Sequence, residues 1–70
     1  MDRTELSVAM IRKGKTNEDM YSVIGISRSA WFRKLSGASE FTQSEICAMR
    51  DILDLDDNKT VKIFFSKKVS

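Results

Sequence analysis

The sequence predicts an all-α domain, a compact bundle of five short helices. Three observations support this fold class: the chain has only 70 residues, it contains no proline, and apolar residues recur at helical spacing between three glycines, Gly14, Gly25 and Gly37. Hydrophobic residues make up 41% and charged residues 31%, which suits one folded core and argues against a disordered chain. We therefore expect residues 1–70 to form a single domain.

The first two helices are predicted on either side of the first glycine. Residues 3–13 form the first, with Gly14 as the C-cap after a basic last turn. Thr16 caps the second helix, and Asp19 stands three residues later in the position of a capping-box acid. Gly25 ends this helix after about two turns. The inward-facing residues are Leu6, Ala9 and Met10 in the first helix and Met20, Val23 and Ile24 in the second.

The third helix is predicted over about residues 28–35. Ser27 is its N-cap, and Ile26 with Trp31 has the spacing of a hydrophobic staple. Trp31 is expected in the core, and Gly37 stops the helix.

The fourth helix has the clearest start signal in the chain. Residues 41–46 combine an N-cap, Thr42, with an acid at the N3 position, Glu45, and with an apolar pair, Phe41 and Ile46, at staple spacing. Cys47 is expected to be a small buried residue of this helix. The inward-facing residues are Ile46, Met49, Ile52 and Leu53, with Leu55 at the helix end.

The last element covers residues 59–67, after a turn rich in aspartate that ends at a cap, Asn58. If this element is a helix, its apolar residues are Val61, Phe64 and Phe65. The alternation of Val61, Ile63 and Phe65 would instead suit a strand. We favour the helix.

Several function classes are excluded by composition. The chain has no histidine and one cysteine, so the sequence lacks an intrachain disulfide, the usual zinc-finger ligand sets and histidine-dependent nucleophilic catalysis. The acidic residues 51–57 lack the glycine and final glutamate of a calcium loop. We expect no enzymatic activity, no cofactor, no metal and no small-molecule ligand. No apolar run is long enough to span a membrane and no signal-peptide pattern is present, so we expect a cytoplasmic protein.

Charge is distributed in blocks although the net charge is only +2. Basic residues dominate residues 12–34 and again from residue 58 onward, whereas acidic residues dominate residues 40–57. A polyanion would therefore approach the basic faces.

Residues 16–36 have the spacing of a helix-turn-helix, in which Gly25 permits the tight turn. An α-helix about 10–12 Å across fits the major groove of B-DNA, which is ~12 Å wide. At about 100° per residue, Trp31 and Leu35 share one side of the third helix, and Ser29 and Arg33 lie opposite. The guanidinium of an arginine can donate two hydrogen bonds to guanine O6 and N7.

The motif residues also carry a family resemblance. Residues 25–29 (Gly-Ile-Ser-Arg-Ser), 35–37 (Leu-Ser-Gly), 16–20 and 40–46 resemble the lambda-repressor-like, Cro/repressor-type (XRE) helix-turn-helix domains, especially short phage-related regulators. The resemblance covers residues 6–65. It implies a five-helix lambda-repressor-like bundle that binds operator DNA, usually as a homodimer. This chain departs from the family at Tyr21, where a small residue is usual, and at Lys34, where an apolar residue is common, so Leu35 takes the inward role.

The resemblance also implies a set of DNA-contacting residues. The base-reading positions fall on Arg28, Ser29 and Arg33. The positions that contact or orient the DNA backbone fall on Asn17 and Ser36, with Ser27 as a further positioning residue. Apart from the resemblance, the charges of Lys34 and Lys15 suit either phosphate contacts or solvated surface positions. Phe32 lies between Arg28 and Ser29 around the helix, so it either contacts a thymine methyl or sugar or packs on a neighbouring loop.

Two functions remain open from sequence. The first is sequence-specific binding of double-stranded DNA by a phage- or prophage-type transcriptional regulator, with the third helix in the major groove. The second is a helical module that binds a partner protein through Phe32 and Phe64, with DNA binding incidental. For the first, a homodimer is expected, and its predicted surface is the apolar tail: Val61, Ile63, Phe64, Phe65 and Val69.

Overall fold

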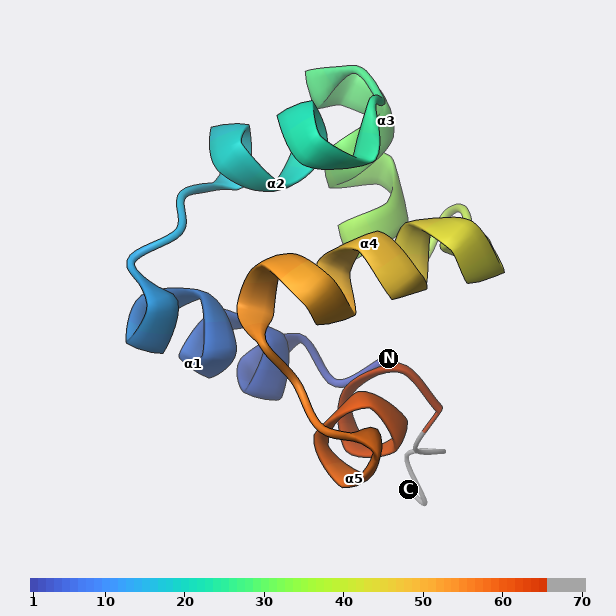
Figure 1. Ribbon diagram of the computed structural model, residues 1–70. Helices are drawn as coiled ribbons and strands as arrows, with labels where there is room; N and C mark the ends of the chain where they lie inside the picture. Colours follow the sequence, from blue (N-terminus) through green and yellow to red (C-terminus); the bar gives the residue numbers. More distant parts are fainter. Residues whose placement is uncertain (66–70) are drawn as a thin grey trace.

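The computed structural model, which describes residues 1–65, is built from helices alone within that range. Five α-helices follow one another, and the last continues directly into a short π-helix. They are α1 (Arg3–Lys13), α2 (Asn17–Ile24), α3 (Arg28–Leu35), α4 (Gln43–Leu53), α5 (Asp57–Thr60) and η1 (Val61–Phe65). Figure 1 shows α2 and α3 at one end of the molecule and α5 at the other, with α4 crossing between them. The predicted small all-α bundle is confirmed.

The predicted boundaries of α1 to α3 and the predicted start of α4 rest on caps that the structure contains. In α2, the Thr16 hydroxyl accepts a hydrogen bond from the backbone nitrogen of Asp19 at 3.1 Å, and the Asp19 carboxylate accepts one from the backbone nitrogen of Thr16 at 2.9 Å. Thr42 and Glu45 make the same reciprocal pair at the start of α4. Gly25 ends α2 with a φ of 81°, a left-handed conformation that glycine adopts without steric cost.

One core joins all the long helices. Its fully or almost fully buried apolar residues are Leu6, Met10, Met20, Trp31, Met49, Leu53 and Ile63. Trp31 is the largest of them and has no exposed surface, as predicted. Burying each side chain of this kind contributes roughly 1.5–3 kcal/mol to stability. The position of α3 is therefore fixed mainly by the packing of Trp31 in the core.

Two predictions for α4 are wrong. The helix ends at Leu53, because Asp54 takes the left-handed C-cap conformation with a φ of 52°, so Leu55 lies beyond the helix. Cys47 is exposed and not buried. It stands two positions before Met49, which is fully buried, and two helical positions turn the side chain by about 200°.

The last element is helical, as favoured, but its start and its inward face differ from the prediction. It begins at Asp57, because the carboxylate of Asp56 accepts a hydrogen bond from the backbone nitrogen of Lys59 at 2.7 Å and so caps α5. The predicted cap, Asn58, lies inside the helix. Residues 66 and 67 of the predicted helix, and Val69, lie outside the described residues.

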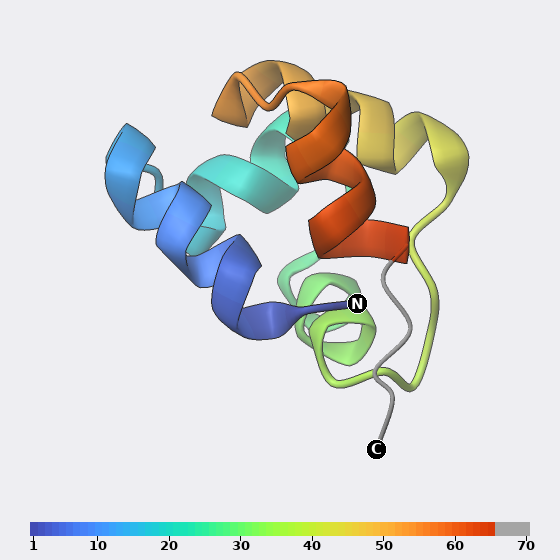
Figure 2. The ribbon, with the colours of Figure 1, turned by 90° about the horizontal axis from the view of Figure 1, so that it is seen from below.

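The apolar side chains of η1 differ in burial. Ile63 is buried, whereas Val61 and Phe65 are exposed. The backbone nitrogen of Asp2 donates a 2.7 Å hydrogen bond to the carbonyl of Ile63, which joins the start of α1 to η1. Figure 2 shows the N-terminus beside this segment. On a regular helix Ile63 and Phe64 lie three and four residues after Thr60 and share its buried face, so helical spacing agrees with the burial. The predicted face took Val61 and Phe65 in place of Ile63.

Within the described range, none of the helices combines the length and the apolar character that crossing a membrane requires.

Candidate nucleic-acid interface

The inner side of α3 is fixed to α2 by its tryptophan. The indole nitrogen of Trp31 donates a 3.0 Å hydrogen bond to the side-chain oxygen of Asn17, the first residue of α2. At the turn between the helices, the Ser27 hydroxyl accepts a hydrogen bond from the backbone nitrogen of Ala30 at 3.1 Å. The start of α2 and the start of α3 are therefore held in one orientation.

The far end of α3 is fixed to α4 by an ion pair. The Lys34 ammonium lies 2.6 Å from a carboxylate oxygen of Glu45 and 3.3 Å from the backbone carbonyl of Glu40. The side chains of the pair are only 14% and 13% exposed. Lys34 also lies over the ring of Phe41, 5.7 Å from its centroid. The prediction that Lys34 contacts DNA phosphates is corrected, because its charge is directed into the protein.

The same ion pair sets the charge of Glu45. Burial raises the pKa of Glu45, but the hydrogen bonds from Lys34 and Thr42 and the positive charge of Lys34 together outweigh burial. The pKa therefore lies below its ordinary value of 4.5, and the carboxylate is ionised at neutral pH. Glu45 serves α4 as a capping acid and α3 as an anchor.

The outer side of α3 exposes a different set of side chains. Arg28, Ser29, Phe32 and Arg33 are all exposed, and they occupy one arc of the helix. Among residues 1–65, no acidic side chain pairs with either arginine. Both guanidinium groups therefore keep their full donor capacity for an external acceptor.

Phe32 stands within this exposed arc. Its side chain is 42% exposed, and the Arg28 guanidinium lies 5.7 Å from the ring centroid, in the range of a cation–π contact. Of the two predicted roles for Phe32, exposure favours the one toward an external partner. The ring also restricts where the Arg28 side chain can lie.

The remaining predicted positions flank the arc. The Ser36 hydroxyl donates a 2.8 Å hydrogen bond to the carbonyl of Arg33 at the end of α3. Asn17 is exposed and has its side-chain oxygen engaged, which leaves its amide hydrogens free to donate. Lys15 lies in the loop before α2, close enough to Asp19 for its charge to act on that carboxylate. The structure thus brings Asn17 and Ser36 to α3 and leaves Lys15 on a separate loop.

The exposed arc has the chemistry of a DNA-reading surface. Two guanidinium groups match guanine O6 and N7, and an exposed ring offers an apolar contact for a thymine methyl. An isolated α-helix face of this kind fits the width of the major groove.

Comparisons of the chain with models of protein families, with curated proteins and with solved structures found no match. The family resemblance consequently stays a prediction that rests on the motif residues. At the first departure from the family, Tyr21 is partly buried and packs against the core. At the second, Leu35 packs against the core in place of Lys34.

Sequence reasoning missed two contacts that orient α3. The Trp31–Asn17 hydrogen bond spans 14 positions and the Lys34–Glu45 ion pair spans 11, so no local pattern reports either of them. The single signal in the sequence was Lys34 itself, a basic residue at a position where the resemblance leads us to expect an apolar one.

Proposed function

We propose that this chain binds double-stranded DNA in a sequence-specific manner, as a phage- or prophage-type transcriptional regulator that acts in the cytoplasm. One observation supports the proposal most. α3 is anchored on its inner side at its middle, through Trp31, and near its C-terminal end, through Lys34, while Arg28, Ser29 and Arg33 project from its outer side without an acidic partner in the described chain. A rigid helix with free donors is what direct reading of base edges requires.

In this proposal the exposed residues have separate roles. Arg28 and Arg33 donate to guanine O6 and N7, and Ser29 donates to or accepts from a neighbouring base. Asn17 and Ser36 contact the phosphates beside the groove, where they set the register of the protein on the duplex. Ser27 keeps its hydroxyl on the cap of α3 and so orients the first turn of that helix.

Specific binding also needs a second half-site, because one helix buries little surface. Two copies would read half-sites about 34 Å apart. The exposed apolar residues of the last element, Val61 and Phe65, with Met1 beside the latter, form the proposed contact between copies. Ile63 no longer belongs to this surface, because it is buried in the core.

A substitution tests the contact between copies. Phe65→Asp places a charge on a side chain that is 59% exposed, so it is expected to weaken self-association and DNA binding together while the fold persists. Sedimentation measures the first effect and DNA titration the second. If Phe65→Asp sediments at every concentration as the unmodified chain does, this surface is ruled out.

The proposed function is tested by selection from a randomised duplex library at two salt concentrations. We expect enrichment of a two-fold symmetric site whose binding survives the higher salt concentration. In Arg28→Ala/Arg33→Ala the enrichment should be lost, since each base contact contributes about 1–3 kcal/mol. Circular dichroism checks that the variant is folded.

The matched control removes the same charge at the opposite end of the molecule. Arg12→Ala/Lys59→Ala, on α1 and α5, should select the same site as the unmodified chain. Binding that is unenriched and lost at modest salt would contradict the proposal, because it would show that the basic faces act only by charge.

The protein-interaction alternative has weaker support than the sequence suggested. It relies on two exposed aromatic side chains, but Phe64 is partly buried, with its ring 6.3 Å from that of Phe41. Phe32 alone keeps the required exposure.

A further inference from the structure

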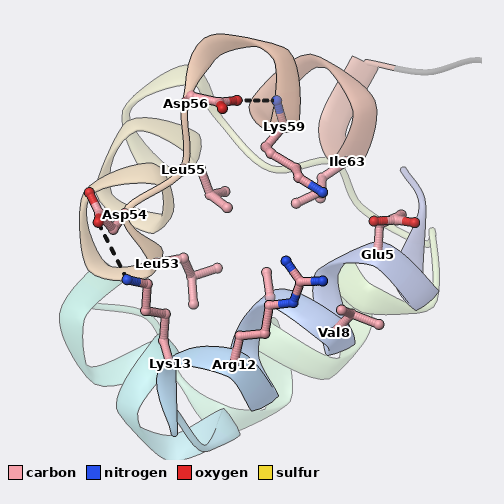
Figure 3. Close-up of a pocket in the computed structure, with 11 residues that line it drawn as sticks. Glu5, Val8, Arg12, Lys13, Leu53, Asp54, Leu55, Asp56, Lys59 and Ile63 are labelled. Atoms are coloured by element: carbon pink, nitrogen blue, oxygen red, sulfur yellow. Dashed lines mark hydrogen bonds and ion pairs between the residues drawn. The ribbon is translucent and has the colours of Figure 1, made fainter.

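A cavity of about 240 Å³ opens between α1, the residues that follow α4, and α5 with η1. Figure 3 shows its lining, and Figure 1 places these elements at the end of the molecule away from α3. Its apolar wall is formed by Val8, Ala9, Leu53, Leu55 and Ile63. The cavity therefore lies outside the proposed DNA-reading surface.

The acidic side chains at the rim of this cavity are already engaged. Asp54 pairs with Lys13 at 3.3 Å, and Glu5 pairs with Lys62 at 3.4 Å. Asp56 accepts a hydrogen bond from the backbone nitrogen of Lys59, in the first turn of α5. None of these three carboxylates pairs with the two other basic side chains at the rim.

Those two basic side chains are Arg12 on α1 and Lys59 on α5. Across residues 1–65, neither has an ion pair or a side-chain hydrogen bond. Figure 3 shows both side chains directed into the space between the two helices, above the apolar wall. Two unpaired cations beside an apolar recess favour a ligand that carries a negative charge on an apolar body.

The π-helical turn supplies one wall of the recess. Ile63 lies three residues after the buried Thr60, shares its face and lines the recess, whereas Val61 and Phe65 are exposed.

We propose that this cavity binds a small carboxylate with an apolar body about the size of one ring. A cavity of about 150 Å³ accommodates benzene in another protein, so the volume here suits a ring together with its carboxylate. The guanidinium of Arg12 binds the carboxylate through paired hydrogen bonds, and the ammonium of Lys59 adds a second positive charge. The sequence predicted no small-molecule ligand, because the lining residues are spread from position 5 to position 63 without a motif.

The site is tested by titrating the full chain with benzoate and following methyl resonances by NMR. We expect saturable shifts at Val8, Leu55 and Ile63. Arg12→Gln and Lys59→Gln should each weaken benzoate binding about tenfold, while Lys59→Arg should retain it. Benzyl alcohol, which has the same ring without the charge, should bind the unmodified chain and both glutamine variants equally weakly.

A matched control and two contrary outcomes complete the test. Arg28→Gln removes one exposed guanidinium from α3 and should leave benzoate binding unchanged. Benzoate affinity that does not depend on Arg12 and Lys59 would overturn the proposal. So would shifts of the same methyl groups on raising protein concentration without benzoate, because a second copy would then cover the cavity.

Discussion

The two sides of α3 differ in what holds their side chains. On the inner side, Trp31 is fully buried and bonded to Asn17, and the ammonium of Lys34 is held by Glu45. On the outer side, the guanidinium of Arg28 lies over the ring of Phe32, a neighbour on the same helix. The comparison teaches that a helix of eight residues can be rigid and still present free donors, provided that its polar anchors lie on the side facing the protein.

The largest expected effect is a difference in the stability lost by substitutions on the inner and outer sides of α3. Trp31→Ala should lower the free energy of unfolding by about 3–5 kcal/mol, because it empties the centre of the core. Phe32→Ala, the adjacent aromatic residue, should cost about 1 kcal/mol or less, since its ring is 42% exposed. Urea denaturation followed by circular dichroism measures both. Equal losses would break the distinction between the two sides.

The next effect compares two lysine–carboxylate pairs. Lys34→Ala should destabilise the protein by about 3 kcal/mol, because it leaves the Glu45 carboxylate largely buried without its cation. Lys13→Ala, whose partner Asp54 is 85% exposed, should cost at most about 1 kcal/mol. The same denaturation experiment applies. If the two variants lose equal stability, Lys34 is not an anchor of α3.

A smaller effect concerns recognition by Phe32, and it depends on the proposed function. Replacing a thymine by uracil in the selected duplex removes one methyl group, and burying such a group contributes about 0.8 kcal/mol, or about fourfold in affinity. We expect this loss at one position of each half-site for the unmodified chain and none for Phe32→Ala. A variant that remains equally sensitive to the replacement would show that Phe32 does not contact the methyl group, while specific binding itself would stand.

The smallest expected effect is a change in how stability depends on pH. The pKa of Glu45 is lower in the folded chain than its ordinary value of 4.5, so the ionised form stabilises the fold above that pH. This contribution decreases as the pH falls below about 4.5 through the folded pKa. In Glu45→Gln the decrease over this range should be shallower. A parallel pH dependence of unfolding in both proteins would contradict the assignment.

Local chemistry explains which parts of the fold the sequence predicted. The bounds of α1 to α3 and the start of α4 follow from side chains within three or four residues, such as Thr16 with Asp19 and Thr42 with Glu45. The predicted exposure of Arg28, Ser29 and Arg33 also followed from helical spacing and agrees with the structure.

Tertiary contacts explain what the sequence did not predict. Cys47 was assigned to the core by residue type, although its helical position turns it outward. Lys34 was assigned to DNA by its charge, because its partner is brought near only when α3 packs on α4. The carbonyl of Ile63 accepts a hydrogen bond from the backbone nitrogen of Asp2, 61 positions earlier, a contact that no local pattern reports.

That hydrogen bond also bears on the order in which the protein folds during synthesis. α2, α3 and α4 are adjacent in the chain, so they can pack on one another as soon as residue 53 has left the ribosome. α1 is synthesised before these three helices, but the hydrogen bond from Asp2 to Ile63 can form only after η1 has emerged. Of the described helices α1 is thus made first, yet it is among the last to gain all its contacts, since it packs on both α4 and η1.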